Sequence, residues 1–340
     1  MKRLLSGNEA VARGAWEAGV AVASAYPGTP STEILEEFAR FPNVYAEWAP
    51  NEKVAVDVAV GAAYAGRRAL AAMKHVGVNV AADPLFTAAY TGVKGGLVIV
   101  TADEPSMYSS QNEQDNRNYA MAAKVPMLEP SDAEEARVFT KFAFSLSEQF
   151  DMPVFVRTTT RLSHSKSIVS LAKRETRQVS GFERNTGKYV MIPANARVRR
   201  QHLEQRLAAL EAASSTHPAN RIEPGNPGVG VITSGIPYTY VKEALPDASV
   251  LKIGLVHPMP KDLVETFART VKTLYVVEEL DPIMETQVKS WGIPCIGKKI
   301  LPTIQITPFA SLLRLPALTP QPFVWPFSFD GHHVDEQSST

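Results

Sequence analysis

Residues 47–74 read EWAPNEKVAVDVAVGAAYAGRRALAAMK, and this stretch decides how the chain around it is interpreted. It predicts a loop, a helix from about Asn51 to Ala65, a tight turn and a buried strand at 69–74. The helix carries almost only Ala and Val on several faces, so we expect it to be packed on most sides. Glu52 lies at the N-terminus of this helix. A carboxylate there is either stabilised by the helix dipole or placed to carry a proton, and the residues alone leave both interpretations open.

The same alternation of helix and strand runs through residues 1–165. The S-x-x-E pattern at 6–9 is typical of a capping box and opens a helix, and the same pattern at 131–134 predicts the start of another. Short apolar strands are expected at 20–25, 43–46, 69–74, 95–101 and 153–157, with helices between them. Such alternation predicts an α/β fold built on an open parallel sheet that helices cover on both faces.

Polar or glycine-containing loops follow three of these strands. They are Tyr26 to Glu33, with Ser31 or Thr32 able to cap the next helix, His75 to Asn79, and Ser109 to Arg117. Because parallel strands end at one edge, these loops should meet where open α/β sheets bind ligands. Ordinary capped turns, a hydrogen-bonded histidine and an exposed polar loop are the alternative interpretations.

The pattern breaks at residues 166–227, which we interpret as a linker with an Ala-rich helix over 198–213. A second α/β unit with a parallel sheet is expected at 228–305, followed by an irregular proline-rich tail at 306–340. His332 and His333 in that tail lack supporting carboxylates, so no metal site is predicted.

Composition excludes several classes of function. Lys+Arg and Asp+Glu both number 35, so no net charge draws the chain to nucleic acid or to an anionic membrane. The basic run at 197–200 is expected to be a solvated helix face. Cys295 is the only cysteine, which excludes a disulfide framework and a cluster held by this chain alone, and it is expected to be a buried structural thiol. No apolar run is long enough for a membrane span or a signal peptide, so we expect a cytoplasmic protein.

Several long motifs together resemble the large (alpha) subunit of indolepyruvate ferredoxin oxidoreductase, a family of thiamine-diphosphate enzymes. The resemblance covers about residues 4–300 and rests on GNEAVARGAWEAGV, YPGTPSTEI, NEKVAVDVAVGAAYAG, MKHVGVNVAADP, YTGVKGGLVIVTADEP, SSQNEQDNR, VPMLEPSDAEEA, RTTTRLSH, VITSGIPYTYVKEAL and VVEELDP. It implies a pyrimidine-binding domain at 1–165 and a transketolase C-terminal-like domain at 228–305. It also implies oxidative decarboxylation of aryl 2-oxo acids to acyl-CoA, with reduction of ferredoxin.

The resemblance also implies roles for the loop residues. Glu52 would be the catalytic glutamate that hydrogen-bonds N1′ of the aminopyrimidine and so activates the cofactor. The other roles that it implies are cofactor binding by Pro27, Gly28 and Asn79, and substrate binding by Thr29, Ser31, His75, Ser110, Gln111 and Arg117, the last as a partner for the substrate carboxylate.

The chain departs from the family pattern in two respects. It has no Gly-Asp-Gly magnesium motif, and a single cysteine cannot hold an iron–sulfur cluster. We therefore expect thiamine diphosphate to be shared with a partner subunit that carries the diphosphate-binding and ferredoxin-like domains, Mg²⁺ and the 4Fe–4S cluster. The further partners implied are a small beta/gamma-type subunit, ferredoxin, an arylpyruvate and CoA, and the apolar helices suggest a homodimer. The alternative is a truncated, inactive relative that serves as an assembly or regulatory module.

Overall fold

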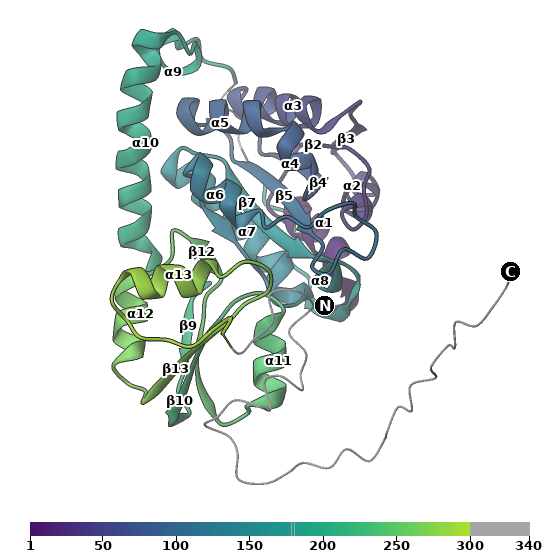
Figure 1. The fold of residues 1–340 in the computed structure, drawn as a ribbon. Coiled ribbons are helices and arrows are strands. Elements are labelled where there is room, and N and C mark those ends of the chain that lie inside the picture. The colour runs from purple at the N-terminus through teal and green to yellow at the C-terminus, as the bar shows by residue number, and fades with distance from the viewer. Residues whose placement is uncertain (178, 180, 300–340) are drawn as a thin grey trace, which may run out of the picture.

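The central element of the fold is a seven-stranded sheet in the order β12-β6-β7-β5-β4-β2-β3 (Figure 1). The computed structural model describes residues 1–177, 179 and 181–299, so the predicted tail at 306–340 and its two histidines lie outside the described residues. The strands are β2 (Val22–Ala25), β3 (Tyr45–Trp48), β4 (Ala69–Lys74), β5 (Leu97–Asp103), β6 (Met127–Leu128), β7 (Val154–Thr159) and β12 (Leu255–His257). All neighbours pair in parallel except β12, which runs antiparallel to β6. The predicted α/β class with a parallel sheet is confirmed.

Helices cover both faces of this sheet. Those in the first half of the chain are α1 (Gly7–Glu17), α2 (Thr32–Ala39), α3 (Glu52–Tyr64), α4 (Gly77–Val80), α5 (Ala82–Thr91), α6 (Arg117–Ala123), α7 (Ala133–Phe150) and α8 (Thr160–His164). The helix α1 packs against α2 and α7 on one face, and α3 packs against α5 on the other. The strands β4, β5 and β7 are therefore buried along almost their whole length.

Helix starts agree with the sequence in one case and differ in another. The capping box at 6–9 is confirmed, since the Ser6 amide donates to Glu9 Oε2 at 2.6 Å and the Glu9 amide donates to Ser6 Oγ at 3.2 Å. The second box is shifted by one residue. Asp132 is the N-cap of α7 and accepts from the Glu135 amide at 2.8 Å, so the predicted pairing of Ser131 with Glu134 is wrong.

A second sheet of four strands has the order β13-β10-β11-β9. It contains β9 (Arg221–Glu223), β10 (Asn226–Thr233), β11 (Ala248–Lys252) and β13 (Thr273–Val277), with helices α11 (Pro237–Ala244), α12 (Lys261–Ala268) and α13 (Ile283–Ser290). The strand β10 runs parallel to β11 and β13. The strand β12 lies within this half of the chain yet completes the first sheet, so the first sheet is not built from residues 1–165 alone.

The predicted linker is more structured than its composition indicated. It contains β8 (Lys166–Ser170), which pairs with β1 (Lys2–Ser6), then α9 (Thr186–Tyr189), the long α10 (Pro193–Ser214) and β9 of the second sheet. The helix α10 runs alongside α5 and down to the second sheet (Figure 1).

One carboxylate fastens α10 to the first sheet's helices. Asp151 accepts from Lys188 Nζ at 2.8 Å and from Arg199 Nη2 at 3.2 Å, and Arg206 Nη1 lies 3.3 Å from its Oδ2. Arg199 is buried and also donates to two backbone carbonyls of α5. The prediction of a wholly solvated basic run is therefore wrong at Arg199.

Candidate functional site

The strand order of the first sheet reverses beside β2. From β2 the chain moves outward to β3, then reverses direction and adds β4 on the other side of β2. Loops that leave the carboxyl ends of β2 and β4 therefore diverge, and open α/β sheets bind ligands at such a reversal point. The loops at 26–31 and 75–79 leave the strands on either side of this reversal point.

Glu52 begins α3 at this same edge. Asn51 is the N-cap of the helix, with its Oδ1 accepting from the Val54 amide at 3.0 Å. The Glu52 side chain is half-buried and packs on Gly77, where an added Cβ would lie 2.6 Å from Glu52 Cγ and 2.7 Å from Oε1. It makes no hydrogen bond or ion pair with any residue in the described part of the chain. Glycine at 77 thus leaves room for a carboxylate whose acceptor sites are open.

The helix behind Glu52 is less enclosed than its composition suggested. Only Ala55, Val56, Ala59 and Ala63 of α3 are buried, while Lys53, Asp57 and Gly61 are exposed. The expectation of packing on most sides is therefore not met within this chain.

The loop after β2 exposes two of its predicted site residues and turns a third inward. Pro27 and Thr29 are exposed and Gly28 is half-buried. Ser31 is buried, and its hydroxyl donates to the Gly28 carbonyl at 2.9 Å, so it shapes the loop instead of being open to a ligand. Ser31 occupies the N-cap position of α2 but makes no side-chain capping bond.

A lysine and a glutamate that sequence reasoning missed join these loops. Lys74 ends β4, and the Gly28 backbone lies over it, since an added Cβ at Gly28 would be 3.3 Å from Lys74 Cβ. Lys74 Nζ is 3.5 Å from Oε2 of the buried Glu104. The Ser109 amide and hydroxyl donate to Glu104 Oε1 at 3.0 and 2.9 Å, and the half-buried Ser110 donates to Oε2.

Glu104 remains ionised because its partners outweigh its burial. Burial raises the pKa of this carboxyl, but the hydrogen bonds from Ser110 and Ser109 and the Lys74 charge leave its pKa lowered. The exposed Gln111 lies just beyond this clamp. Lys74 and Glu104 could have been found from the sequence, because each carries a charge at the end of a buried strand and a charge there needs a partner.

The loop after β4 holds its polar groups in two different ways. His75 is fully buried, with Nε2 3.2 Å from the Asn112 carbonyl oxygen, while its Nδ1 has no partner among the described residues. Asn116 Nδ2 donates to the His75 carbonyl at 3.2 Å. Asn79 is exposed at the rim and accepts from the Tyr119 hydroxyl. His75 is therefore placed to anchor the 109–117 segment, and only Asn79 is open to a ligand.

Arg117 does not fit its predicted role. It is buried at the start of α6, donates to Asp115 Oδ2 at 2.6 Å and to Glu278 Oε2 at 2.6 Å, and donates to the carbonyls of residues 279 and 281. Although burial lowers its pKa, Asp115 and Glu278 raise the pKa well above the ordinary value. The expectation that Arg117 receives a substrate carboxylate is corrected, because carboxylates of its own chain occupy the guanidinium.

Arg117 belongs to a buried charge cluster between the two sheets, comprising Asp103, Asp115, Arg117, Glu129, Arg157, Glu278 and Glu279. Arg157 Nε donates to Asp103 Oδ2 at 2.6 Å and its Nη1 donates to Glu129. Ser234, at the end of β10, donates to Glu129 Oε2 at 3.0 Å. These contacts join residues far apart in sequence, which composition and periodicity did not indicate.

Residues 1–177, 179 and 181–299 contain no group of three or more His, Cys, Asp or Glu side chains arranged to hold a metal ion. Over the same residues, no helix is long and apolar enough to cross a membrane.

Cys295 is half-buried, less enclosed than predicted, and burial raises the pKa of its thiol to about 11. The thiol therefore stays protonated and unreactive near neutral pH.

Comparison with known proteins agrees with this geometry. Residues 13–223 match the family model described as "Pyruvate flavodoxin/ferredoxin oxidoreductase, thiamine diP-bdg". The protein named indolepyruvate oxidoreductase subunit IorA from Archaeoglobus fulgidus is 48% identical over 305 residues, which are 86% of this chain and 49% of that protein. The chain thus spans about half the length of the curated IorA relatives that it matches.

Two solved structures share the fold. The 2-oxoglutarate:ferredoxin oxidoreductase from Magnetococcus marinus superposes with a TM-score of 0.73 at 20% identity, covering 87% of this chain and 61% of that one. A split gene transketolase superposes with a TM-score of 0.55 at 15% identity, covering 86% and 88%. Since the family model matches more than half of the residues, this chain belongs to the pyruvate flavodoxin/ferredoxin oxidoreductase family of thiamine-diphosphate-binding proteins.

Proposed function

We propose that this chain supplies the aminopyrimidine-binding half of a thiamine-diphosphate-dependent 2-oxoacid:ferredoxin oxidoreductase. The proposed reaction is oxidative decarboxylation of aryl 2-oxo acids, such as indolepyruvate, to acyl-CoA. The observation that carries the proposal is Glu52, a half-buried carboxylate at a helix start with no hydrogen-bonding partner in the described chain. The names of the relatives support the aryl substrate.

The residues around Glu52 fit one end of the cofactor. Glu52, packed on Gly77, would accept from a ring nitrogen, and we assign Pro27, Gly28 and Asn79, on loops at the same edge of the sheet, to the same end of the cofactor. When bound, thiamine diphosphate supplies the acidic carbon that attacks the keto group and takes up the electrons left by decarboxylation. The part played by this chain is to hold a proton between a Glu52 oxygen and that ring nitrogen.

Nothing described here fits the other end of the cofactor. No carboxylate group is arranged for Mg²⁺ among residues 1–177, 179 and 181–299. We propose that a partner subunit supplies the diphosphate, Mg²⁺ and iron–sulfur functions. A second copy of this chain, a small beta/gamma-type subunit and ferredoxin complete the proposed assembly. The partly exposed face of α3 is available for such contacts.

Lys74 replaces Arg117 as the proposed partner of the substrate carboxylate. It lies between the 26–31 loop and the Ser109–Ser110 clamp, and Glu104 at 3.5 Å holds it without a close hydrogen bond. Thr29, Ser110 and Gln111 stand at the same edge of the sheet. An ammonium without a close hydrogen bond, beside polar side chains, suits the carboxylate of a small 2-oxo acid.

Substituting Glu52 tests the proposal. In the enzyme assembled with its partner subunits, Glu52→Gln should abolish turnover and leave the assembly intact, because Gln keeps the shape but cannot hold the proton. The matched control is Glu36→Gln, an exposed carboxylate of α2 without a described ion pair. Normal turnover by Glu52→Gln would instead support an assembly or regulatory module.

Calorimetry provides a second readout that does not depend on activity. Thiamine diphosphate with Mg²⁺ should bind weakly or not at all to the isolated chain, since only half of the site is present. Tight binding would show that the chain holds the cofactor by itself and would contradict the shared site.

Substitution of Lys74 tests its proposed contact with the substrate carboxylate. Lys74→Met should raise KM for the 2-oxo acid more than it lowers kcat.

A further inference from the structure

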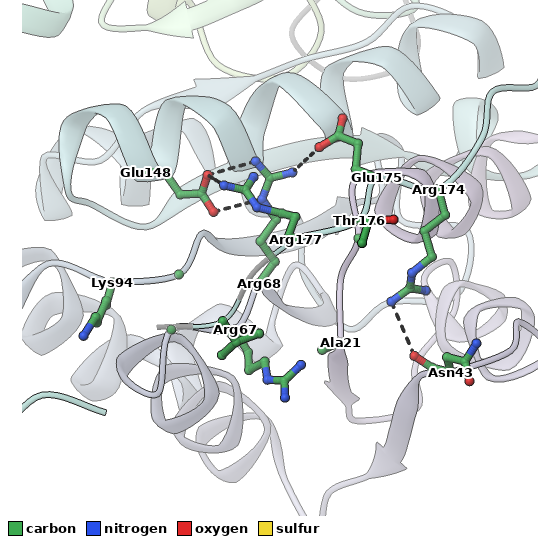
Figure 2. A pocket seen from close by; sticks show the side chains of 14 residues that line it. Ala21, Asn43, Arg67, Arg68, Lys94, Glu148, Arg174, Glu175, Thr176 and Arg177 are labelled. Carbon is green, nitrogen blue, oxygen red and sulfur yellow. Dashed lines mark hydrogen bonds and ion pairs between the residues drawn. The ribbon is translucent and has the colours of Figure 1, made fainter. Parts of the chain in front are cut away.

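A cavity lies at the edge of the first sheet where its strands begin, opposite the edge that holds Glu52. It is lined by residues just before β2, β3, β4 and β5, by the last turns of α7 and by segment 174–177 (Figure 2). Its volume is about 580 Å³, which is the size of small-molecule sites. We call it the amino-edge pocket.

The amino-edge pocket carries an excess of positive charge. Its described lining includes the cations Arg67, Arg68, Lys94, Arg174 and Arg177, and the carboxylates Glu148 and Glu175. The lining therefore holds three more cations than anions. Arginine does not lose its proton in proteins, so this excess cannot be relieved by titration of the arginines.

Both carboxylates are already used by two of the arginines. Glu148 accepts from the buried Arg68 through two bonds of 2.9 Å each, and Arg177 Nη2 lies 2.9 Å from its Oε2. Glu175 accepts from Arg68 Nη1 at 3.1 Å. These contacts tie segment 174–177 to the sheet and to α7 (Figure 2), so the wall of the pocket is already formed.

Arg67 is left without an anionic partner. Its side chain is exposed and makes no hydrogen bond or ion pair with the described residues. Its backbone, by contrast, is fixed: the Arg67 amide donates to the Ala62 carbonyl at 3.0 Å, and Gly95 packs so closely that an added Cβ would lie 2.3 Å from Arg67 O. A fixed backbone with an unengaged guanidinium is suited to an incoming ligand.

Arg174 also lacks a carboxylate partner among the described residues. Its Nη2 donates to the Val20 carbonyl at 2.9 Å and to the Asn43 carbonyl at 3.4 Å. Lys94 reaches only the exposed Glu183, at 3.3 Å. The two carboxylates of the lining therefore leave much of its positive charge uncompensated.

We propose that the amino-edge pocket binds a small phosphate-bearing molecule, with the Arg67 guanidinium as its main ligand. Phosphate oxygens match the planar fork of arginine, and a phosphate monoester carries nearly two charges that offset the excess. None of the described lining residues is aromatic, so no ring is present on which a nucleobase would stack. The expected ligand is thus a polar phosphorylated compound and not a nucleotide read through its base.

Calorimetric titration of the full chain with pyrophosphate tests the proposal. The natural chain should bind it with 1:1 stoichiometry, and the affinity should fall as salt is raised. Arg67→Gln should weaken binding by about tenfold or more, and Arg67→Lys should give an intermediate loss. Arg67 is exposed, so these variants should fold normally, which circular dichroism will verify.

Two controls separate this site from others. Arg269→Gln, at the end of α12, removes an exposed arginine elsewhere and should leave binding unchanged. Glu52→Gln should also leave it unchanged, since Glu52 lies at the opposite edge of the sheet; this result is independent of whether the proposed enzymatic function holds. Absence of binding to the natural chain at millimolar pyrophosphate, or equal binding by Arg67→Gln, would overturn the proposal.

Discussion

Glu279 makes the stability of this protein depend on pH. It follows β13 by two residues, is buried in the charge cluster between the two sheets, and its Oε2 has no partner among the described residues. Burial raises the pKa of its carboxyl to about 7, against the opposing effect of Arg157 and with a further rise from Glu129. Glu279→Gln keeps the size of the side chain and removes the titration.

The sign follows from the raised pKa. Between pH 4.5 and 7 the folded chain keeps a proton on Glu279 that the unfolded chain releases, so the stabilising contribution is complete below pH 4.5 and is lost as pH rises to 7. A shift from 4.5 to about 7 corresponds to about 3 kcal/mol in total, most of it lost between about pH 4.5 and 7. Glu279→Gln should therefore exceed the natural chain in stability by about 3 kcal/mol at pH 8, and by little at pH 4.5.

Urea unfolding followed by circular dichroism at pH 5, 6, 7 and 8 measures this difference directly. The quantity of interest is the free energy of unfolding of the variant minus that of the natural chain, because other titrating groups cancel in the subtraction. Glu243→Gln, an exposed carboxylate on α11, is the control and should show a difference that does not change with pH. A Glu279→Gln difference that stayed constant from pH 5 to 8, or that reversed its sign, would refute the assignment of this pH dependence to Glu279.

Two further predictions concern the position of Glu52 and the attachment of α10. Gly77→Ala should reduce turnover of the assembled enzyme by at least about tenfold, because the new Cβ would lie 2.6 Å from Glu52 Cγ and displace the Glu52 carboxylate. The control is Gly61→Ala, since an added Cβ there meets nothing within 4 Å. It should leave activity unchanged and stabilise α3 by about 0.5–1 kcal/mol in urea unfolding. Unchanged activity in Gly77→Ala would show that the position of Glu52 does not matter. Asp151→Asn should lower the free energy of unfolding by about 2 kcal/mol, since it removes the charge that Lys188 and Arg199 share; a loss under about 0.5 kcal/mol would mean that α10 is held by its carbonyl contacts alone.

Local patterns in the sequence were sufficient for most of the first sheet. The capping pattern at 6–9 and the apolar run of β4 both depend on neighbours in the chain, and the structure agrees with them. The strand β12 was missed because its three residues are too short for a periodic signal and pair with a strand from the other half of the chain.

The sequence predicts at which edge of the sheet the candidate loops lie, but not how their side chains point. The loops that follow β2, β4 and β5 meet at one edge because parallel strands require it. The direction of each side chain within those loops depends on tertiary partners. Arg117 points into the interior because Glu278, far along the chain, neutralises it, and Ser31 turns back onto its own loop. No local pattern carries that information.

The placement of β12 constrains how the protein folds during synthesis. Since β6 is followed in the sheet by β12, the ribosome releases β6 long before the strand that covers its edge. Until His257 has emerged, the outer edge of Met127 and Leu128, which pair with β7 on their other side, stays open to pairing with another strand. The first sheet is therefore completed only late in translation, and a chain interrupted before residue 257 is expected to aggregate.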